Sequence, residues 1–477
     1  MRLRIPSRVP LLIAGYLALT AATTAPAQQQ QPGKPFSMLV VSDPQYPWTW
    51  VTDKNIELQN LRKYCATYPA EAICAKPIPA DLPGDDIPTA NQHNTNLRAH
   101  LDRLIAANSQ IRGVIFNGDL TNYGHDWHLA GFKQFYDSLK VTRFLGLGNH
   151  DYQNNVNNTR ENLGATRMVE YLRDEVRKLP VPVSFDYSER AETGKFFLEG
   201  SLAYSWDIEH IHFVQLNNYP LYEASWGNYR SDRFTWVQVN IKNSLNWLEK
   251  DLAAARSKGQ AIILNLHDAD DPWKDPDPKL QTELNRILTA YDITAVLAGH
   301  HHTRLGKQGS RWFDQSPGLP AHVAKLSQIP QIPTFYSSAA SQDGFLSVTF
   351  NATEMRISKV HSAAKNGQQP GVPFDEQIVP LKRSAGNSSC APRTFRSVSE
   401  HTWVEYRMPA AALGTTVNIP AGAHNKYVFP KCNRVWWDNL AFGCRVDGWA
   451  LTSGRYDADA NCTGTPGNSP YVAYGDR

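Results

Sequence analysis

Five short polar blocks, each directly after an apolar segment, constrain the fold of this chain more than any other feature. The apolar segments are short and rich in β-branched residues, which predicts buried strands. Because the carboxyl ends of parallel strands meet at one edge of an α/β sheet, the blocks are expected to lie together. They offer carboxylate, amide and imidazole groups, which are ligands for two adjacent divalent metal ions. The blocks are Asp43-Pro44-Gln45, Gly118-Asp119, Gly148-Asn149-His150-Asp151, His267 and Gly299-His300-His301-His302.

Strand-like and helical segments alternate between about residues 36 and 362, which is typical of an α/β fold. Helices are expected at 97–107, 129–139, 167–179, 242–256 and 280–291. Strands are expected at 38–42, 114–117, 144–147, 202–208, 210–216, 261–266 and 294–297, followed by antiparallel finishing strands at 334–338, 345–350 and 355–360. The segment 65–96, rich in Pro, Ala and Asp, is expected to be an insertion near the site. A pair of mixed sheets fits this order better than a barrel.

Residues 1–27 have the pattern of a secretory signal peptide. Arginines at positions 2, 4 and 8 precede a mostly apolar run from Leu11 to Thr24, and Ala25-Pro26-Ala27 offers small residues for cleavage. A single anchoring helix is the alternative, but the run is short for a bilayer and is interrupted by Gly15. Cleavage after about Ala27 predicts a secreted or periplasmic protein with no transmembrane segment in the mature chain.

The formal net charge of +3 belongs to this leader. Its removal takes away three arginines and no acidic residue, which leaves 45 basic residues against 45 acidic ones. A balanced mature chain has no electrostatic reason to attract a polyanion, so no nucleic-acid partner is expected.

Six cysteines, an even number in an exported chain, favour disulfides. Cys65 and Cys74 are expected to close one loop. The other four cysteines allow three pairings, and the sequence does not choose among them. A cysteine zinc site is disfavoured, because the sequence contains no C-x-x-C spacing. These four are Cys390, Cys432, Cys444 and Cys462.

Composition divides the mature chain into a main domain, 28–364, a linker, 365–392, and a small all-β, disulfide-tied accessory domain, 393–477. The linker is rich in Gly, Pro, Ser, Asn and Gln. The last region holds short aromatic and β-branched runs, including Trp436-Trp437. These aromatic side chains suit either the core of a small domain or contact with glycans or the cell envelope, and both readings stay open.

The ordered blocks resemble those of the calcineurin-like metallophosphoesterase family, over about residues 36–362. The resemblance implies a four-layer αββα sandwich with two mixed sheets and two divalent cations at its rim. It implies Asp43, Gln45, Asp119 and His302 as ligands of one cation. It implies Asp119, Asn149, His267 and His300 as ligands of the other, with Asp119 as the bridge. A hydroxide shared by the two cations would attack the phosphate ester.

His150 matches the family histidine that faces the phosphate without binding metal, which implies a general acid. Asp151 is expected to fix the tautomer of His150 from behind. His301 is expected to point away from the metals, and His210 and His212 are interpreted as packing residues.

The first block departs from the commoner family pattern, because Gln45 stands where Asp-x-His has a histidine. A neutral amide oxygen favours Mn²⁺, Mg²⁺ or Fe²⁺ over tightly held Zn²⁺, and leaves the metal identity open. The purple acid phosphatase branch is disfavoured, because Asn122 occupies the place of its metal-bound tyrosine.

Asp-Pro-Gln also occurs in protein phosphatase-like members of the family, so a secreted phosphomonoesterase acting on small-molecule or protein-linked phosphates is favoured. A phosphodiesterase of the nucleotide, glycerophosphodiester or phospholipid type is the alternative. A non-catalytic envelope- or glycan-binding protein on the same scaffold is the third hypothesis. Every ligand position holds a donor, which favours an enzyme.

Overall fold

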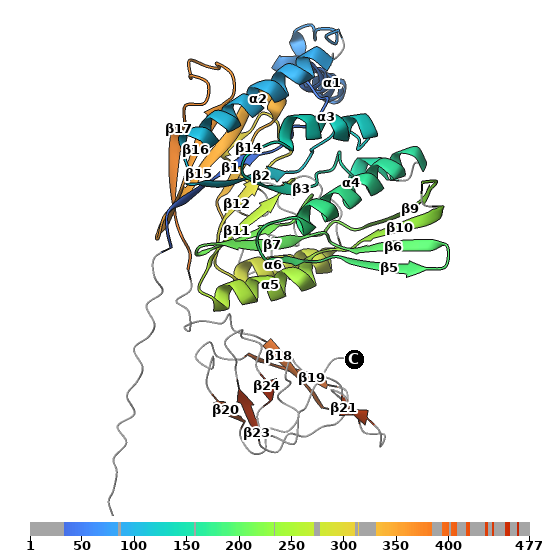
Figure 1. The fold of residues 1–477 in the computed structure, drawn as a ribbon, viewed down its shortest axis with the longest axis vertical. Coiled ribbons are helices and arrows are strands. Elements are labelled where there is room, and N and C mark those ends of the chain that lie inside the picture. Colours follow the sequence, from blue (N-terminus) through green and yellow to red (C-terminus); the bar gives the residue numbers. More distant parts are fainter. Residues whose placement is uncertain are drawn as a thin grey trace, which may run out of the picture. The chain divides into compact units, whose positions relative to one another are not determined.

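The computed structural model describes residues 33–383, apart from 84–86, 157–158, 233, 271–276, 311–312 and 314–330, together with short strands after residue 383. The predicted signal peptide lies outside the described residues. Two large mixed sheets and a smaller one make up the body of residues 33–383 (Figure 1). Among the described helices, none combines the length and apolarity that crossing a bilayer requires.

The first sheet has six strands in the order β17-β16-β15-β1-β2-β3. Three of them run parallel and carry the first three polar blocks at their carboxyl ends: β1 (Phe36–Val41), β2 (Ile111–Asn117) and β3 (Thr142–Gly146). The others are antiparallel: β15 (Gly344–Phe350), β16 (Glu354–His361) and β17 (Phe374–Pro380). Every residue of β1 is buried, as expected for a strand covered on both faces.

The second sheet has seven strands in the order β13-β14-β12-β11-β8-β7-β4. Its parallel part consists of β8 (Ile211–Gln215), β11 (Ala261–Leu266), β12 (Ile293–Ala298) and β14 (Thr334–Ser337). The antiparallel strands are β4 (Val183–Phe185), β7 (Tyr204–Ile208) and β13 (Leu305–Lys307). A separate four-stranded sheet contains β5 (Ser188–Glu192), β6 (Lys195–Gly200), β9 (Ala224–Arg230) and β10 (Thr235–Ile241).

The two large sheets pack face to face through aromatic side chains. The Phe144 ring of β3 stacks on Trp206 of β7 with centroids 4.2 Å apart, and Phe36 meets Phe213 edge to face at 6.3 Å. Helices cover the outer faces. On the first sheet, Phe132 of α3 (Asp126–Tyr136) packs on Phe116 of β2, and α2 (Ile87–Ala107) contacts α3. The outer face of the second sheet packs on α5 (Leu245–Ser257) and α6 (Pro278–Ala290).

The predicted α/β sandwich of two mixed sheets is therefore confirmed, with several local corrections. β14 was expected to be antiparallel, but it runs parallel to β12. The predicted linker, 365–392, contains β17, which pairs with β16 and extends the first sheet. α4 (Thr159–Arg177) begins earlier than expected, and the small sheet was not expected at all.

The segment expected to be an insertion is largely helical. It contains the end of α1 (Trp50–Thr67), a 3-10 turn at Ala72–Ala75 and the start of α2. The expected disulfide between Cys65 and Cys74 joins α1 to this turn, with Cα atoms 5.4 Å apart.

After residue 383 the structure describes strands alone, from β18 (Thr394–Ser399) and β19 (Thr402–Arg407) onward. Cys390, Cys432, Cys444 and Cys462 lie outside the described residues, so their pairing stays a prediction. The same holds for glycan or envelope contact through residues 393–477.

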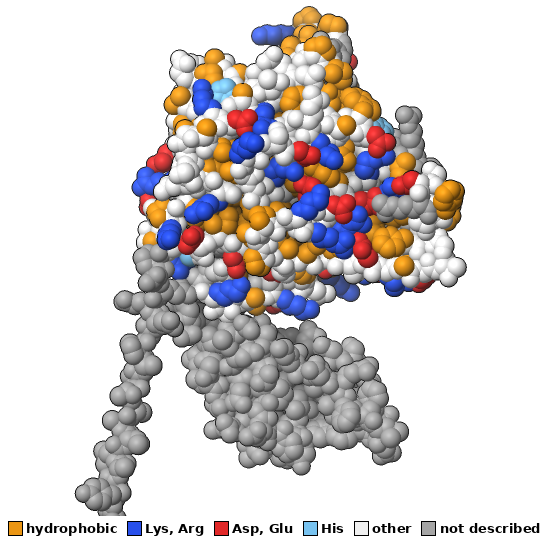
Figure 2. All heavy atoms as spheres, in the orientation of Figure 1, with side chains coloured by type: hydrophobic (Ala, Val, Ile, Leu, Met, Phe, Trp, Pro, Cys, Tyr) orange, Lys and Arg blue, Asp and Glu red, His pale blue; other side chains and the backbone are white. Residues whose placement is uncertain are grey.

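On the face of residues 33–383 in view, basic and acidic side chains are interspersed (Figure 2). This mixture agrees with the balanced charge of the mature sequence.

Candidate metal centre

The five polar blocks meet at one edge of the sandwich, in the loops that follow β1, β2, β3, β11 and β12. Asn117, the last residue of β2, ties the two sheets together there. Its side-chain Nδ2 donates to the carbonyl of Leu297 on β12 at 2.9 Å, and its own carbonyl lies 2.8 Å from Nδ1 of His267. The convergence expected from parallel strands is therefore present.

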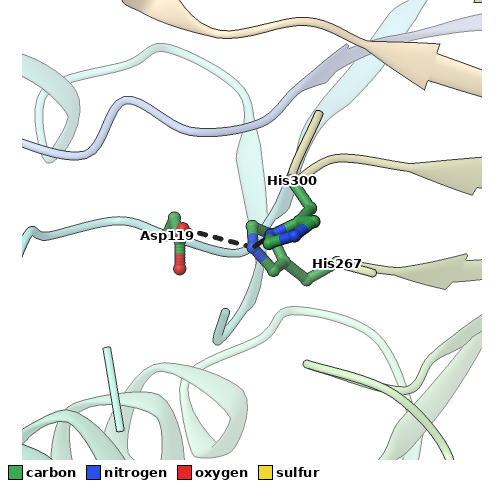
Figure 3. A group of neighbouring side chains, drawn as sticks. All are labelled: Asp119, His267 and His300. Carbon is green, nitrogen blue, oxygen red and sulfur yellow. Dashed lines mark hydrogen bonds and ion pairs between the residues drawn. The ribbon is translucent and has the colours of Figure 1, made fainter. Parts of the chain in front are cut away.

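Two groups of ligand atoms share Asp119. One contains Asp119, His267 and His300, and the other Asp43, Asp119 and His302; within each group the ligand atoms lie no more than 4.8 Å apart. Figure 3 shows the first group, in which Asp119 and His267 face one another, with Nε2 of His267 3.2 Å from Oδ2 of Asp119. In the second group Nε2 of His302 lies 3.2 Å from Oδ1 of Asp43.

Asn149 completes the first group. Its Oδ1 lies 2.9 Å from Nε2 of His267 and 3.1 Å from Nδ1 of His300, and these two nitrogens are 3.3 Å apart. Donor atoms held by one cation at about 2.1 Å, with angles of about 90–110°, are themselves separated by about 3.0–3.4 Å. The spacing of these three atoms therefore fits one shared cation.

The family resemblance implies Gln45 as a further ligand of the second group, and its backbone N–H donates to the Asp119 carbonyl at 2.8 Å. Its side chain is 1% exposed, and neither Oε1 nor Nε2 has a hydrogen-bond partner among the described residues. A buried polar group without a partner costs about 1–3 kcal/mol. A cation bound to Oε1 would offset this cost, so the residues present fit the metal pair that the resemblance implies.

The backbone is strained at these same residues. Asp43, Asp119 and His300 have φ angles of 50°, 49° and 67°, in the left-handed region that residues with side chains avoid. Such strain persists where the surrounding structure imposes it, typically at functional sites. Gly148 allows the loop after β3 to lie close to Asp119, because a Cβ there would collide with the side chain and backbone nitrogen of Asp119.

Each histidine of the centre uses one ring nitrogen outside the site and presents the other to it. Nδ1 of His267 donates to the Asn117 carbonyl at 2.8 Å, and Nδ1 of His302 lies 2.5 Å from Oδ1 of Asp53. His300 is turned the other way, with Nε2 3.3 Å from Oδ2 of Asp268 and Nδ1 toward Asn149. These outer partners select the tautomer that a metal ligand needs.

Burial and opposite charges act against each other at these groups. Burial alone would raise the pKa of Asp119, but His267 and the other nearby histidines hold it below its usual range. Burial would lower the pKa of His267, yet Asp119 and Asp43 raise that pKa to about 10. Because a proton and a metal ion compete for the same imidazole nitrogen, metal binding at this residue must release a proton.

His150 lies beside the two groups, with its backbone N–H donating to Oδ1 of Asp119 at 2.8 Å. Its ring Nδ1 is 3.1 Å from both the carbonyl and the side-chain oxygen of Asn122. The edges of Trp48 and Tyr123 pack against the ring, with centroids 5.2 and 5.8 Å away. His150 is therefore oriented by Asn122 and by two aromatic neighbours.

The expectation that Asp151 fixes the tautomer of His150 was wrong. The Asp151 carboxylate accepts hydrogen bonds from the backbone N–H groups of Leu120, Thr121 and Gly148, at 2.9–3.0 Å, and from the Thr121 hydroxyl. It joins the loops after β2 and β3, which position Asp119 and Asn149. Burial, followed by the charge of Asp119, raises the pKa of Asp151 to about 7.

The residues that sequence reasoning missed act on the histidines from outside the motifs. In the sequence, Asn122 marks only a departure from the purple acid phosphatase branch, and nothing distinguishes Asp53 from other carboxylates. No local pattern marks either residue, since each contacts a histidine distant in sequence. His301 has Nε2 3.3 Å from Oδ2 of Asp270 and packs against Tyr336, in keeping with the structural role expected for it.

Comparison with known proteins agrees with this geometry. The family model described as calcineurin-like phosphoesterase matches residues 37–304, which is more than half of the 477-residue chain. Purple acid phosphatase 21 of Arabidopsis thaliana is 26% identical over 110 residues, which cover 22% of this chain and 21% of that protein. Asn122, in the place of the metal-bound tyrosine, disfavours the purple acid phosphatase branch, and a similarity over about a fifth of each chain leaves that a prediction.

Similar solved structures are distant in sequence. A purple acid phosphatase from yellow lupin seeds covers 72% of this chain, aligned to 54% of its own, with 12% identity and a TM-score of 0.35. GAP50, the anchor in the inner membrane complex of Plasmodium, covers 74% of this chain and 90% of its own, with 9% identity and a TM-score of 0.38. On the extent of the family match, this chain belongs to the calcineurin-like phosphoesterase family.

Proposed function

We propose that this protein hydrolyses phosphate esters at a centre of two divalent cations, and that phosphomonoesters are its preferred substrates. One observation carries the proposal: the ligand atoms of Asp43, Asp119, His267, His300 and His302 gather in two groups that share Asp119. Two cations bound there would provide an acidified water as nucleophile and positive charge for the phosphate oxygens.

The side chains around the cations have separate tasks. Asp119, buried and anionic, would hold the two cations at the short separation that a shared water needs. The buried amide of Gln45 and the amide oxygen of Asn149 add ligands without adding charge. The centre therefore keeps a net positive field toward the dianionic phosphate of a monoester.

His150 is the proton donor to the leaving group in this proposal. With its Nδ1–H held by the two oxygens of Asn122, the imidazolium form of the ring carries its second proton on Nε2, and the ring becomes neutral when that proton is transferred. A proton delivered from Nε2 to the ester oxygen would prevent the departure of an unstable alkoxide. Asn122 thus takes the orienting role that was expected of Asp151.

Oxygen donors at Gln45 and Asn149 favour Mn²⁺, Fe²⁺ or Mg²⁺ over Zn²⁺ at this centre. The signal-peptide pattern of residues 1–27 supports a secreted or periplasmic location, which the disulfide between Cys65 and Cys74 suits. Small-molecule and protein-linked phosphates are both proposed substrates. A phosphodiester substrate is the alternative within the same chemistry.

The proposal is tested by stripping the full-length protein of metal and adding back Mn²⁺, Mg²⁺, Fe²⁺ and Zn²⁺ one at a time. Hydrolysis of para-nitrophenyl phosphate is then compared with that of bis-para-nitrophenyl phosphate. We expect activity to return with Mn²⁺ or Fe²⁺ and to favour the monoester. A preference for the diester would favour a phosphodiesterase. If neither ester were hydrolysed with any cation, the proposal that the protein is a phosphoesterase would be contradicted.

A further inference from the structure

The carboxylate of Asp53 lies directly behind His302, on the side away from the candidate metal centre. Asp53 belongs to the first turn of α1, whose N-cap is Thr49. Its Oδ1 is 2.5 Å from Nδ1 of His302 and accepts a second hydrogen bond from Nε1 of Trp48 at 2.9 Å. The Trp48 ring also packs edge to face against His302, with centroids 5.6 Å apart.

The other oxygen of Asp53 is equally occupied. Oδ2 accepts from the Ser341 hydroxyl at 2.6 Å and from Nε2 of Gln342 at 2.7 Å, both in the short turn before β15. Gln342 is itself oriented, because Nζ of Lys365 lies 2.9 Å from its carbonyl and 3.3 Å from its Oε1. Four donors thus fix one carboxylate, which connects α1, the loop after β12 and the turn before β15.

Such a contact has two effects on a metal-binding imidazole. It selects the tautomer in which Nε2 is free, and it makes Nε2 more basic by drawing Nδ1–H toward the carboxylate. Among the described residues, His302 is the only imidazole in its group, which otherwise contains Asp43 and Asp119. The buried, unpartnered amide of Gln45 is the further ligand that the family resemblance implies. The affinity of this group for its cation should therefore depend more on the basicity of His302 than the affinity of the other group depends on either of its histidines.

The two groups differ in how their histidines are supported. His267 is backed by a neutral carbonyl, that of Asn117, and Nε2 of His300 lies 3.3 Å from the Asp268 carboxylate. Within the described residues, the contact of Asp53 with His302 is the closest carboxylate support in the centre. Loss of this support would act on one cation site and leave the other intact.

We propose that Asp53 is a positioning residue for the first cation site, where its hold on His302 compensates for the amide at Gln45 in place of a histidine. The inference rests on the dinuclear centre proposed above. It concerns a residue outside all five motif blocks. Asp53 touches neither cation nor substrate and acts through His302.

The test is a Mn²⁺ titration of metal-stripped full-length protein, followed by the paramagnetic resonance signal of free Mn²⁺ and by competition with a chelator. For Asp53→Asn we expect one of the two ions to bind ten- to a hundredfold more weakly, as is usual when such an outer partner is lost. The other ion should bind within about twofold of the wild-type affinity. The coupled signal of a Mn²⁺ pair should disappear at metal concentrations that saturate the wild type.

Asp207→Asn is the matched control, because Asp207 makes the same kind of contact with a buried histidine, His212, at 2.7 Å. It should leave both Mn²⁺ affinities unchanged. The double variant Gln45→His with Asp53→Asn should recover most of the lost affinity, which a general loss of structure would not allow. Ser341→Ala keeps the Asp53 carboxylate and removes one of its donors. It should weaken the affinity for the same ion by a few-fold, and it replaces Asp53→Asn as the test if that variant does not fold.

Wild-type affinity for both ions in Asp53→Asn, or in Ser341→Ala where that variant stands in, would overturn the inference. Equal weakening of both ions, without recovery by Gln45→His, would also overturn it and assign Asp53 to general stability. A wild-type protein that binds fewer than two Mn²⁺ ions would contradict the proposed function instead. The two failures are therefore distinguishable.

Discussion

Two clusters of buried histidine and aspartate lie in the same sandwich, yet they are built for different ends. His212 on β8 is flanked by Asp207, 2.7 Å from its Nδ1, and Asp251, 2.8 Å from its Nε2. Both of its nitrogens thus have a carboxylate partner, and Asp251 also accepts from Ser205 at 2.7 Å. This cluster is a closed ion pair that connects β7, β8 and α5.

At the candidate metal centre, by contrast, each histidine has only one nitrogen engaged outside the site. The remaining nitrogens converge with the oxygens of Asp119, Asn149 and Asp43, and the amide of Gln45 is buried without a hydrogen-bond partner among the described residues. Both clusters therefore combine histidine with aspartate, and each contains buried members, such as His212 in one and Asp119 in the other. The difference is whether donor atoms are satisfied within the protein or left directed at a common point.

Asp119→Asn should produce the largest effect, because it removes the charge shared by both cation sites. We expect kcat/KM to fall by at least about 10³-fold and bound metal to fall below two ions per chain. Asp251→Asn, at the closed cluster, is the control and should retain both ions. Metal content by elemental analysis distinguishes the two variants. An Asp119→Asn protein that keeps two ions and full activity would show that Asp119 is not a shared ligand.

His150→Ala should lower turnover by about 10²–10⁴-fold, the usual contribution of a general acid. Metal content should remain at two ions, since His150 contacts the centre through its backbone N–H. Asn122→Ala should show a smaller loss of the same kind. Loss of both ions in His150→Ala would assign this residue to metal binding.

Asp251→Asn should mainly affect stability. It leaves His212, buried at 4% exposure, with one carboxylate in place of two. Removing one partner of a buried pair costs about 3 kcal/mol, which urea unfolding of the metal-free protein would measure. An unchanged free energy of unfolding would show that the closed cluster contributes little.

The smallest expected effect is on how stability depends on pH. The stabilisation that the His212 cluster provides should fall as the pH rises, whereas the stabilisation by metal at the candidate centre should grow. Burial alone would lower the pKa of His212, but Asp207 and Asp251 raise it from 6.5 to about 9. This pair should stabilise the fold fully below pH 6.5 and lose that contribution as the pH rises through about 9. The stabilisation by added Mn²⁺ should instead grow with pH, because metal binding releases protons.

The measurement compares the free energy of unfolding of the metal-free wild type with that of His212→Gln between pH 6 and pH 9.5. The difference between the two proteins should shrink as the pH rises. A difference that grows with pH would mean that His212 is neutral in the folded protein.

The sequence was most informative where structure is local. Apolar runs such as Phe36–Val41, followed at once by polar blocks, predict both a buried parallel strand and the ligands at its end. The grouping of the candidate ligand atoms around Asp119 could therefore be anticipated, and their binding of metal stays a prediction. His212 was interpreted as a packing residue, since nothing nearby in sequence shows that Asp251, 39 residues away, completes its ion pair.

Features that depend on distant pairing were missed for the same reason. β17 has an edge strand's mostly exposed pattern and only its register with β16 places it in the sheet. Asp53 lies 249 residues from His302, and Asn122 lies 28 residues from His150. Their roles follow from the packing of α1 and of the loop after β2, which no local periodicity encodes.

We infer that the candidate metal centre holds two cations on one shared aspartate, Asp119. Anomalous scattering from crystals of the full-length protein soaked in Mn²⁺ tests it most directly. We expect two peaks about 3.5–4 Å apart, both within bonding distance of Asp119, and no peak at His212. A single peak, or a pair that does not share Asp119, would contradict it.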